Sequence, residues 1–141
     1  MREPWLRAGL ALLAASAAVV GFWALLAPRS FYDDFPGGGR SWVSALPPYN
    51  EHLVRDVGGL NLALVLLLAW AAASLDRRLV TVGLLAYLVN AVPHFVFHVT
   101  ELGSLATVDQ IGETFSLAVA LVLPVVLLAP ALRLPAARDG A

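Results

Sequence analysis

The sequence has no cysteine and no lysine, and only 13% of its 141 residues are charged. Without cysteine, the chain has neither a disulfide framework nor a thiolate metal site. Arginine supplies all nine positive charges, and the net charge of −1 leaves no basic surface of the kind that binds nucleic acid. So few charges, beside 60% hydrophobic residues and a mean hydropathy of +0.78, exclude an ordinary soluble domain. The composition indicates an integral membrane protein whose main partner is the lipid bilayer.

Four apolar runs are each long enough to cross the hydrocarbon core, which takes about 20 helical residues. Their approximate bounds are 8–27, 51–75, 79–101 and 109–132. Pro28 after the first run is a poor context for signal-peptide cleavage, so this run is expected to be a retained helix. Short connections between the later runs favour antiparallel neighbours. The sequence therefore predicts an all-α fold, a single multi-pass membrane domain over residues 1–141 built as an up-and-down four-helix bundle.

Residues 28–50 form a different kind of segment, which we expect to be an extracytoplasmic loop. Pro36, Pro48 and the glycines 37–39 prevent one continuous helix. Two roles remain open for its aromatic residues, an interfacial belt or a lid over a pocket. These residues are Phe31, Tyr32, Phe35, Trp42 and Tyr49. Asn50 is placed to cap the helix that follows.

The arginines predict the orientation. The N-terminus, the 76–78 loop and the C-terminus together hold six arginines against three carboxylates, namely Arg2, Arg7, Arg77, Arg78, Arg133 and Arg138 against Glu3, Asp76 and Asp139. The opposite side holds three arginines against seven carboxylates. Because cytoplasmic loops carry the excess of arginine, we expect both termini in the cytoplasm and the chain in the cell (inner or plasma) membrane.

A polar stripe runs along the third predicted helix. At 100° per residue, its members fall within about 80° of one another, while the other faces are apolar. The stripe consists of Tyr87, Asn90, His94, His98 and Glu101. In a helix this apolar, such a stripe is expected to face partner helices or water and to mark a functional site.

The starts of the second and fourth predicted helices are also polar, and up-and-down packing brings both beside the outer end of the third. The sequence thus predicts a His/carboxylate pocket near the extracytoplasmic face. Its candidate ligand or metal residues are His94, His98, His52, Glu51, Glu101 and Glu113. Its supporting polar residues are Asn90, Arg55, Asp56, Asp109, Tyr87 and Asn61.

Several functions are compatible with such a pocket. His94 and His98 are one turn apart, a spacing that chelates one divalent metal when a carboxylate joins them. The pocket also suits a small or lipid-like ligand. Alternatively, the polar residues only hold the bundle of a structural or accessory subunit together. Haem between His52 and His98, or a proton or solute path, are further alternatives. The sequence does not decide whether the chain is an enzyme, or whether it forms a homo-oligomer or binds a membrane partner protein.

The start of the second helix carries a loose motif, Arg55-x-x-Gly58-Gly59-x-x-x-Ala63. With four short apolar helices, this motif resembles small bacterial DoxX-like integral membrane proteins of unknown function. The resemblance implies the four-helix fold and no particular reaction. The Asn50-Glu51-His52 opening and the His94/His98 pair are not part of that pattern.

Overall fold

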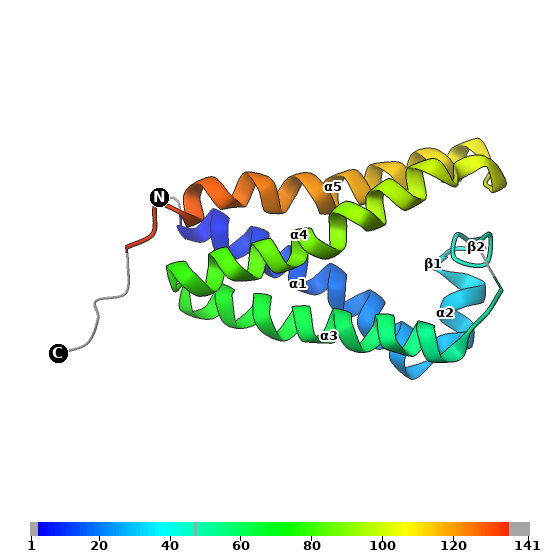
Figure 1. Cartoon of the computed structure of the whole chain (residues 1–141), viewed down its shortest axis with the longest axis horizontal. Helices are drawn as coiled ribbons and strands as arrows, with labels where there is room; N and C mark the ends of the chain where they lie inside the picture. The colour runs from blue at the N-terminus through cyan, green and yellow to red at the C-terminus, as the bar shows by residue number, and fades with distance from the viewer. Residues whose placement is uncertain (1–2, 47, 136–141) are drawn as a thin grey trace.

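Four long helices make up most of the chain. The computed structural model describes residues 3–46 and 48–135. Within them α1 (Glu3–Leu26), α3 (Glu51–Ser74), α4 (Arg77–Thr100) and α5 (Thr107–Ala131) run up and down along one axis (Figure 1). Helices of 24 or 25 residues are about 36 Å long, more than the hydrocarbon thickness of a bilayer. The predicted all-α fold is confirmed for the described residues, apart from a hairpin of two strands with two residues each.

The expected loop 28–50 contains more structure than the sequence indicated. It holds the short helix α2 (Pro28–Asp34) and a hairpin of β1 (Pro36–Gly37) and β2 (Arg40–Ser41). Proline suits the first position of α2 because that position needs no N–H donor. The three glycines of the turn all have positive φ, at 102°, 66° and 77°, which other residues rarely adopt. A 3₁₀ turn, η1 (Leu102–Ser104), joins α4 to α5.

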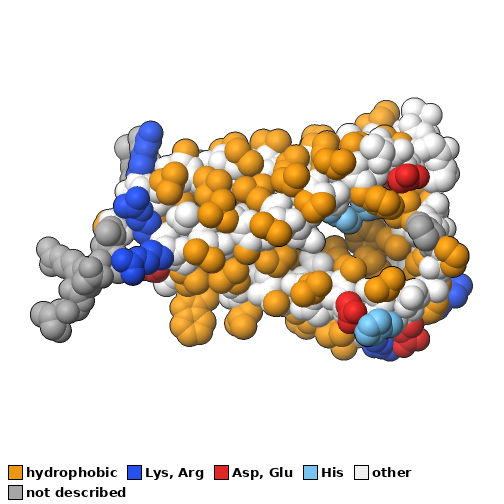
Figure 2. Space-filling model, in the orientation of Figure 1, with side chains coloured by type: hydrophobic (Ala, Val, Ile, Leu, Met, Phe, Trp, Pro, Cys, Tyr) orange, Lys and Arg blue, Asp and Glu red, His pale blue; other side chains and the backbone are white. Residues whose placement is uncertain are grey.

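Large apolar side chains cover the outside of the long helices (Figure 2). Trp5, Leu60, Trp70, Val89 and Phe115 are each between 66% and 79% exposed. All four helices are long and apolar enough to cross a membrane. A bilayer removes such surface from water, so the length and composition of these helices indicate a membrane protein.

The helices form two pairs. α1 packs chiefly on α3 and α4 chiefly on α5, while α3–α4 and α1–α5 contacts close the ring. We call the end where α1 begins and α5 ends the terminus end, and the end that holds α2, the hairpin and η1 the hairpin end (Figure 1). The buried core lies toward the terminus end, where it includes Leu6, Leu10, Leu13, Leu68, Val80, Leu84, Leu127 and Ala131.

The two pairs separate toward the hairpin end. α4 runs diagonally away from α3 and follows α5 (Figure 1). The buried residues of α4 accordingly stop at Ala91, two positions before Pro93. Beyond this level the buried apolar residues of the described chain, such as Ala24 and Phe31, lie on α1 and α2. Most of the candidate polar residues lie in this part.

A close crossing fixes α1 against α3. A Cβ on Gly58 would lie 2.5 Å from the backbone nitrogen of Leu25, so only glycine allows this approach. The Arg55 guanidinium donates to the carbonyl of Leu25 at the same crossing. Both contacts involve the backbone of Leu25, so α3 is held close to α1 at Gly58 and a larger residue has little room there.

Polar caps define the helix ends. The predicted Asn50 cap is confirmed, because its side chain accepts from the Leu53 N–H at 3.3 Å. Asp76 caps α4 in the same way, accepting from the Leu79 N–H at 2.8 Å. The connection between α3 and α4 consists of Leu75 and Asp76, which is shorter than the expected loop 76–78. Arg7 donates to the carbonyls of Ala72 and Ala73 in the last turn of α3, where a positive charge is favourable.

Candidate functional site

The polar centre of the hairpin end is a contact between α4 and α5. His98 Nδ1 lies 2.8 Å from Glu113 Oε1, and the two side chains are 12% and 5% exposed. Glu113 is the one charged residue that is buried in the described part of the chain. A buried carboxylate needs a partner, because an unpaired charge away from water is costly. The His98–Glu113 pair therefore joins α4 to α5.

His94 continues the buried face of α4 toward the hairpin end. By helical periodicity, His94 and His98 lie on the same side as Tyr87 and Ala91, which are both 7% exposed. The two imidazoles contact each other edge to face, with centroids 4.4 Å apart. His94 is nevertheless exposed, because α4 has left α3 at this level. It therefore faces the space between the helix pairs.

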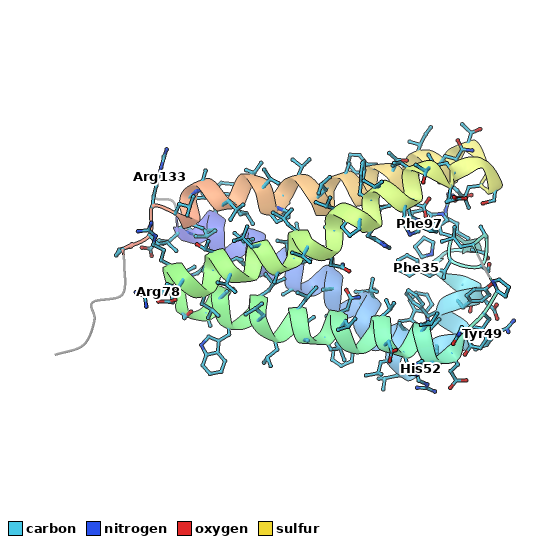
Figure 3. All side chains as sticks on the ribbon, viewed as in Figure 1. Phe35, Tyr49, His52, Arg78, Phe97 and Arg133 are labelled. Atoms are coloured by element: carbon cyan, nitrogen blue, oxygen red, sulfur yellow. The ribbon has the colours of Figure 1, made fainter. Side chains whose placement is uncertain are left out.

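This space is visible as a hollow in the face of the bundle between α3 and α4, with a histidine at its edge (Figure 2). Phe35, which follows α2, and Phe97, on α4, lie beside the same space (Figure 3). The hollow opens sideways between α3 and α4. We use the name hollow for this space throughout.

The arrangement of the pair defines its chemistry. When Glu113 is ionised, the Nδ1–H of a neutral His98 donates to it, and Nε2 remains as an acceptor or base. A hydroxyl or an ammonium group entering the hollow would find this nitrogen and the imidazole of His94. The pair can therefore bind a polar head group or accept a proton from it.

Aromatic side chains close the hairpin end of the hollow. Trp23, Phe31, Phe35 and Trp42 form a chain of ring contacts, which we call the aromatic cap. Centroid distances are 6.1 Å for Trp23–Phe31, 4.9 Å for Phe31–Phe35 and 6.2 Å for Phe35–Trp42. Edge-to-face and tilted contacts of this kind are favourable. The two roles considered for these aromatic residues, a belt or a lid, both stay predictions.

Asp109 ties the cap to α5. Trp42 Nε1 donates to Asp109 Oδ1 at 2.9 Å, and the Arg40 guanidinium forms an ion pair with the same oxygen. A Cβ on Gly112 would lie 3.2 Å from the Trp42 ring, so Trp42 rests directly on α5. Asp109 was predicted as a supporting residue, but its partners Arg40 and Trp42 were missed. Arg40 opens β2 and Trp42 directly follows it, so the available signal was their i,i+2 spacing in extended chain, which puts both on one side.

A second opening lies beside the hollow on the hairpin-end surface. It is a cavity of about 580 Å³ between the chain after the hairpin and the end of α4. Its lining includes Phe97, Thr100, Glu101 and Ser104. Phe97 also contacts the His98 ring, with centroids 5.6 Å apart. One aromatic ring thus stands between this cavity and the His98–Glu113 pair.

The polar residues at the start of α3 form pairs of their own. Arg55 pairs with Glu51 at 2.8 Å, and His52 lies 3.3 Å from Asp56. The His52 side chain is 83% exposed and lies on the outer side of α3, away from the hollow (Figure 3). The structure therefore does not bring Glu51, His52, Arg55 or Asp56 to the His98–Glu113 pair. His52 is also poorly placed for the haem alternative, which needs it opposite His98.

The remaining candidates are spread along the helices. Tyr87 is buried and His98 half-buried, whereas Asn90, His94 and Glu101 are exposed, so the predicted stripe is buried only in part. Asn61 donates to the carbonyl of Val57 on its own helix. No three His, Asp or Glu side chains of the described residues come together as a group able to hold a metal ion. Of the predicted ligand or metal residues, His94, His98 and Glu113 are the ones that the structure brings into contact.

A charged aromatic contact joins α2 to the start of α3 on the surface. The Arg29 guanidinium lies 5.0 Å from the Tyr49 ring centroid and pairs with Asp33 at 2.6 Å. The hydrogen bond and charge of Asp33 raise the pKa of Arg29 above its usual value. Partial desolvation, followed by the nearby Glu51 carboxylate, raises the pKa of the Tyr49 phenol. These groups position the cap and lie apart from the hollow.

The fold and composition define the chain as a helical protein with four candidate membrane-spanning helices. No protein-family model, no curated protein and no solved structure matches it. The resemblance of Arg55, Gly58, Gly59 and Ala63 to the DoxX-like pattern therefore stays a prediction. Any function has to be argued from the site itself.

Proposed function

We propose that the chain is a multi-pass membrane protein that binds a small lipid-like molecule in the hollow. The acyl part would enter sideways between α3 and α4, and the polar head would meet the His98–Glu113 pair. The observation that carries this proposal is a buried His–carboxylate pair, with a second exposed imidazole beside it, in a hollow between apolar helices. Polar groups at such a depth are costly unless they serve structure or function.

The charge distribution supports an orientation with both termini in the cytoplasm. Arg78 and Arg133 lie at the terminus end (Figure 3), where arginine side chains gather in the space-filling view (Figure 2). Arg2, Arg138 and Asp139, which were counted in the sequence, lie outside the described residues. In this orientation the aromatic cap faces the extracytoplasmic side. The hollow then lies in the outer leaflet.

A structural role is the second candidate, and one observation favours it. Among the described residues, every buried side-chain nitrogen and oxygen has a hydrogen-bond partner. The His98–Glu113 pair would then serve only to join α4 to α5, as polar pairs do between membrane helices. The two candidates differ in what the exposed imidazole of His94 contacts.

Photo-crosslinking separates the two candidates. The probe is a long-chain alcohol that carries a diazirine in its chain, added to the purified chain in lipid nanodiscs. We expect saturable labelling of α4 and α5 residues around His94, His98 and Glu113, identified by peptide mass spectrometry. Excess unlabelled alcohol of the same length should abolish it.

His98→Ala should reduce this labelling at least about tenfold, since it removes the acceptor that holds the head group. His52→Ala is the matched control, because His52 is exposed on the far side of α3, and it should label as the wild type does. Labelling spread evenly over the lipid-facing surfaces, and equal in all three proteins, would leave only the structural role.

A further inference from the structure

We infer that the hollow prefers a ligand whose polar head is positively charged, such as a long-chain amine in its protonated form, with Glu113 as the counter-ion. This inference rests on the proposed function and adds the charge of the ligand. It follows from how the charges at the hairpin end are paired.

The acidic side chains at the hairpin end differ in their partners. Asp109 is neutralised by Arg40, Glu51 by Arg55 and Asp33 by Arg29. Asp56 pairs with His52 and Asp34 with Ser30, and both of these carboxylates are exposed. Glu113 differs because it is buried and because no arginine among the described residues is paired with it. Its partner is His98, which carries a charge only when it is protonated.

An ionised Glu113 beside a neutral imidazole leaves one negative charge without a countercharge in a poorly hydrated place. Such a charge is stabilised when a cation approaches within a few ångströms. An ammonium head in the hollow supplies that cation and donates hydrogen bonds to the free imidazole nitrogens. An anionic head would face the carboxylate and be repelled, whereas a neutral head would gain hydrogen bonds only.

The residues around the hollow also favour a ligand with a positively charged head. Phe97 contacts the His98 ring, and Phe35 lies beside the hollow (Figure 3), so aromatic rings, which attract cations, border the site. Glu101 lines the 580 Å³ cavity on the other side of Phe97. Its charge raises the local concentration of cations at the hairpin end. The cavity and the hollow are therefore both suited to a cationic head.

A competition series measures this preference with the same diazirine probe in nanodiscs. The competitors are dodecylamine, dodecanol and dodecanoate, which share one chain length and differ in the charge of the head. We expect dodecylamine to displace the probe at about tenfold lower concentration than dodecanol, and dodecanoate to be weakest. In Glu113→Gln the amine and the alcohol should compete about equally. Glu101→Gln should keep the wild-type order with a smaller advantage for the amine.

The outcomes separate the two proposals. If dodecanol competes as well as dodecylamine in the wild type, the hollow binds lipid-like molecules but the charge preference is wrong. If none of the three competes, the hollow is not a ligand site and both proposals fail. Because the wild-type order alone decides the charge preference, the test holds even if Glu113→Gln does not fold.

Discussion

At the scale of single residues, the His98–Glu113 pair shows how a membrane helix accommodates a carboxylate. Glu113 is only 5% exposed at its side chain, yet the bond to His98 satisfies it. Periodicity along α4 was enough to predict that His94 and His98 share a face. It was not enough to choose Glu113 from the four acidic or imidazole partners considered. That choice depends on how α5 is rotated against α4, which no local pattern records.

The stability of the pair can be measured directly. Glu113→Ala should lower the free energy of unfolding by about 1–3 kcal/mol, because it removes a buried hydrogen bond and leaves the imidazole unpaired. Glu113→Gln keeps a hydrogen-bonding side chain and should lose less. The measurement is unfolding in mixed micelles, followed by circular dichroism.

Glu101→Ala is the matched control for these variants, since Glu101 is exposed and surface substitutions change stability by about 0.5 kcal/mol or less. A loss for Glu113→Ala no larger than that of the control would show that the pair does not stabilise the bundle.

At the scale of elements, the long helices were predictable because each is a long run of apolar residues. Asn50 caps the start of α3 and Asp76 the start of α4. The short elements were not predictable. α2 is seven residues long and depends on Phe31 packing under Trp23 and Phe35, which only the folded chain brings together. The separation of α4 from α3, which creates the hollow, is also a tertiary feature.

The α1–α3 crossing gives a sharp test of element packing. Gly58→Ala should destabilise the chain by about 1–3 kcal/mol, because the new methyl group would meet the backbone of Leu25. The control is Gly59→Ala, whose Cβ would meet nothing within 4 Å and which should be neutral or slightly stabilising, because alanine favours helix. Thermal unfolding of the two variants should differ clearly; equal midpoints would mean that the crossing is looser than described.

The contact of the hairpin with α5 predicts a change in proteolysis. Asp109→Ala removes the acceptor of both Arg40 and Trp42, so the hairpin should open more often and trypsin should cleave after Arg40 several-fold faster. In Asp34→Asn, a change on α2 where the carboxylate accepts from Ser30, cleavage at Arg40 should stay at the wild-type rate. An unchanged rate in Asp109→Ala would rule out Asp109 as the anchor of the cap.

At the scale of the whole molecule, the arginine distribution predicts which side each end faces. The absence of cysteine makes this simple to test, because a single introduced thiol has no background. Ser41→Cys lies at the hairpin end and Ser74→Cys at the terminus end. An impermeant maleimide should label Ser41→Cys in intact cells and Ser74→Cys only after permeabilisation. The reverse pattern would invert the topology and place the hollow in the inner leaflet.

The central claim is that the hollow is a binding site, and native mass spectrometry of the chain released from nanodiscs tests it most directly. With added dodecylamine, the wild type and His52→Ala should each retain one molecule per chain at saturation, while Glu113→Ala and His98→Ala should retain none above background. If all four proteins instead bind the same series of several dodecylamine molecules, without reaching saturation, the result would contradict the account.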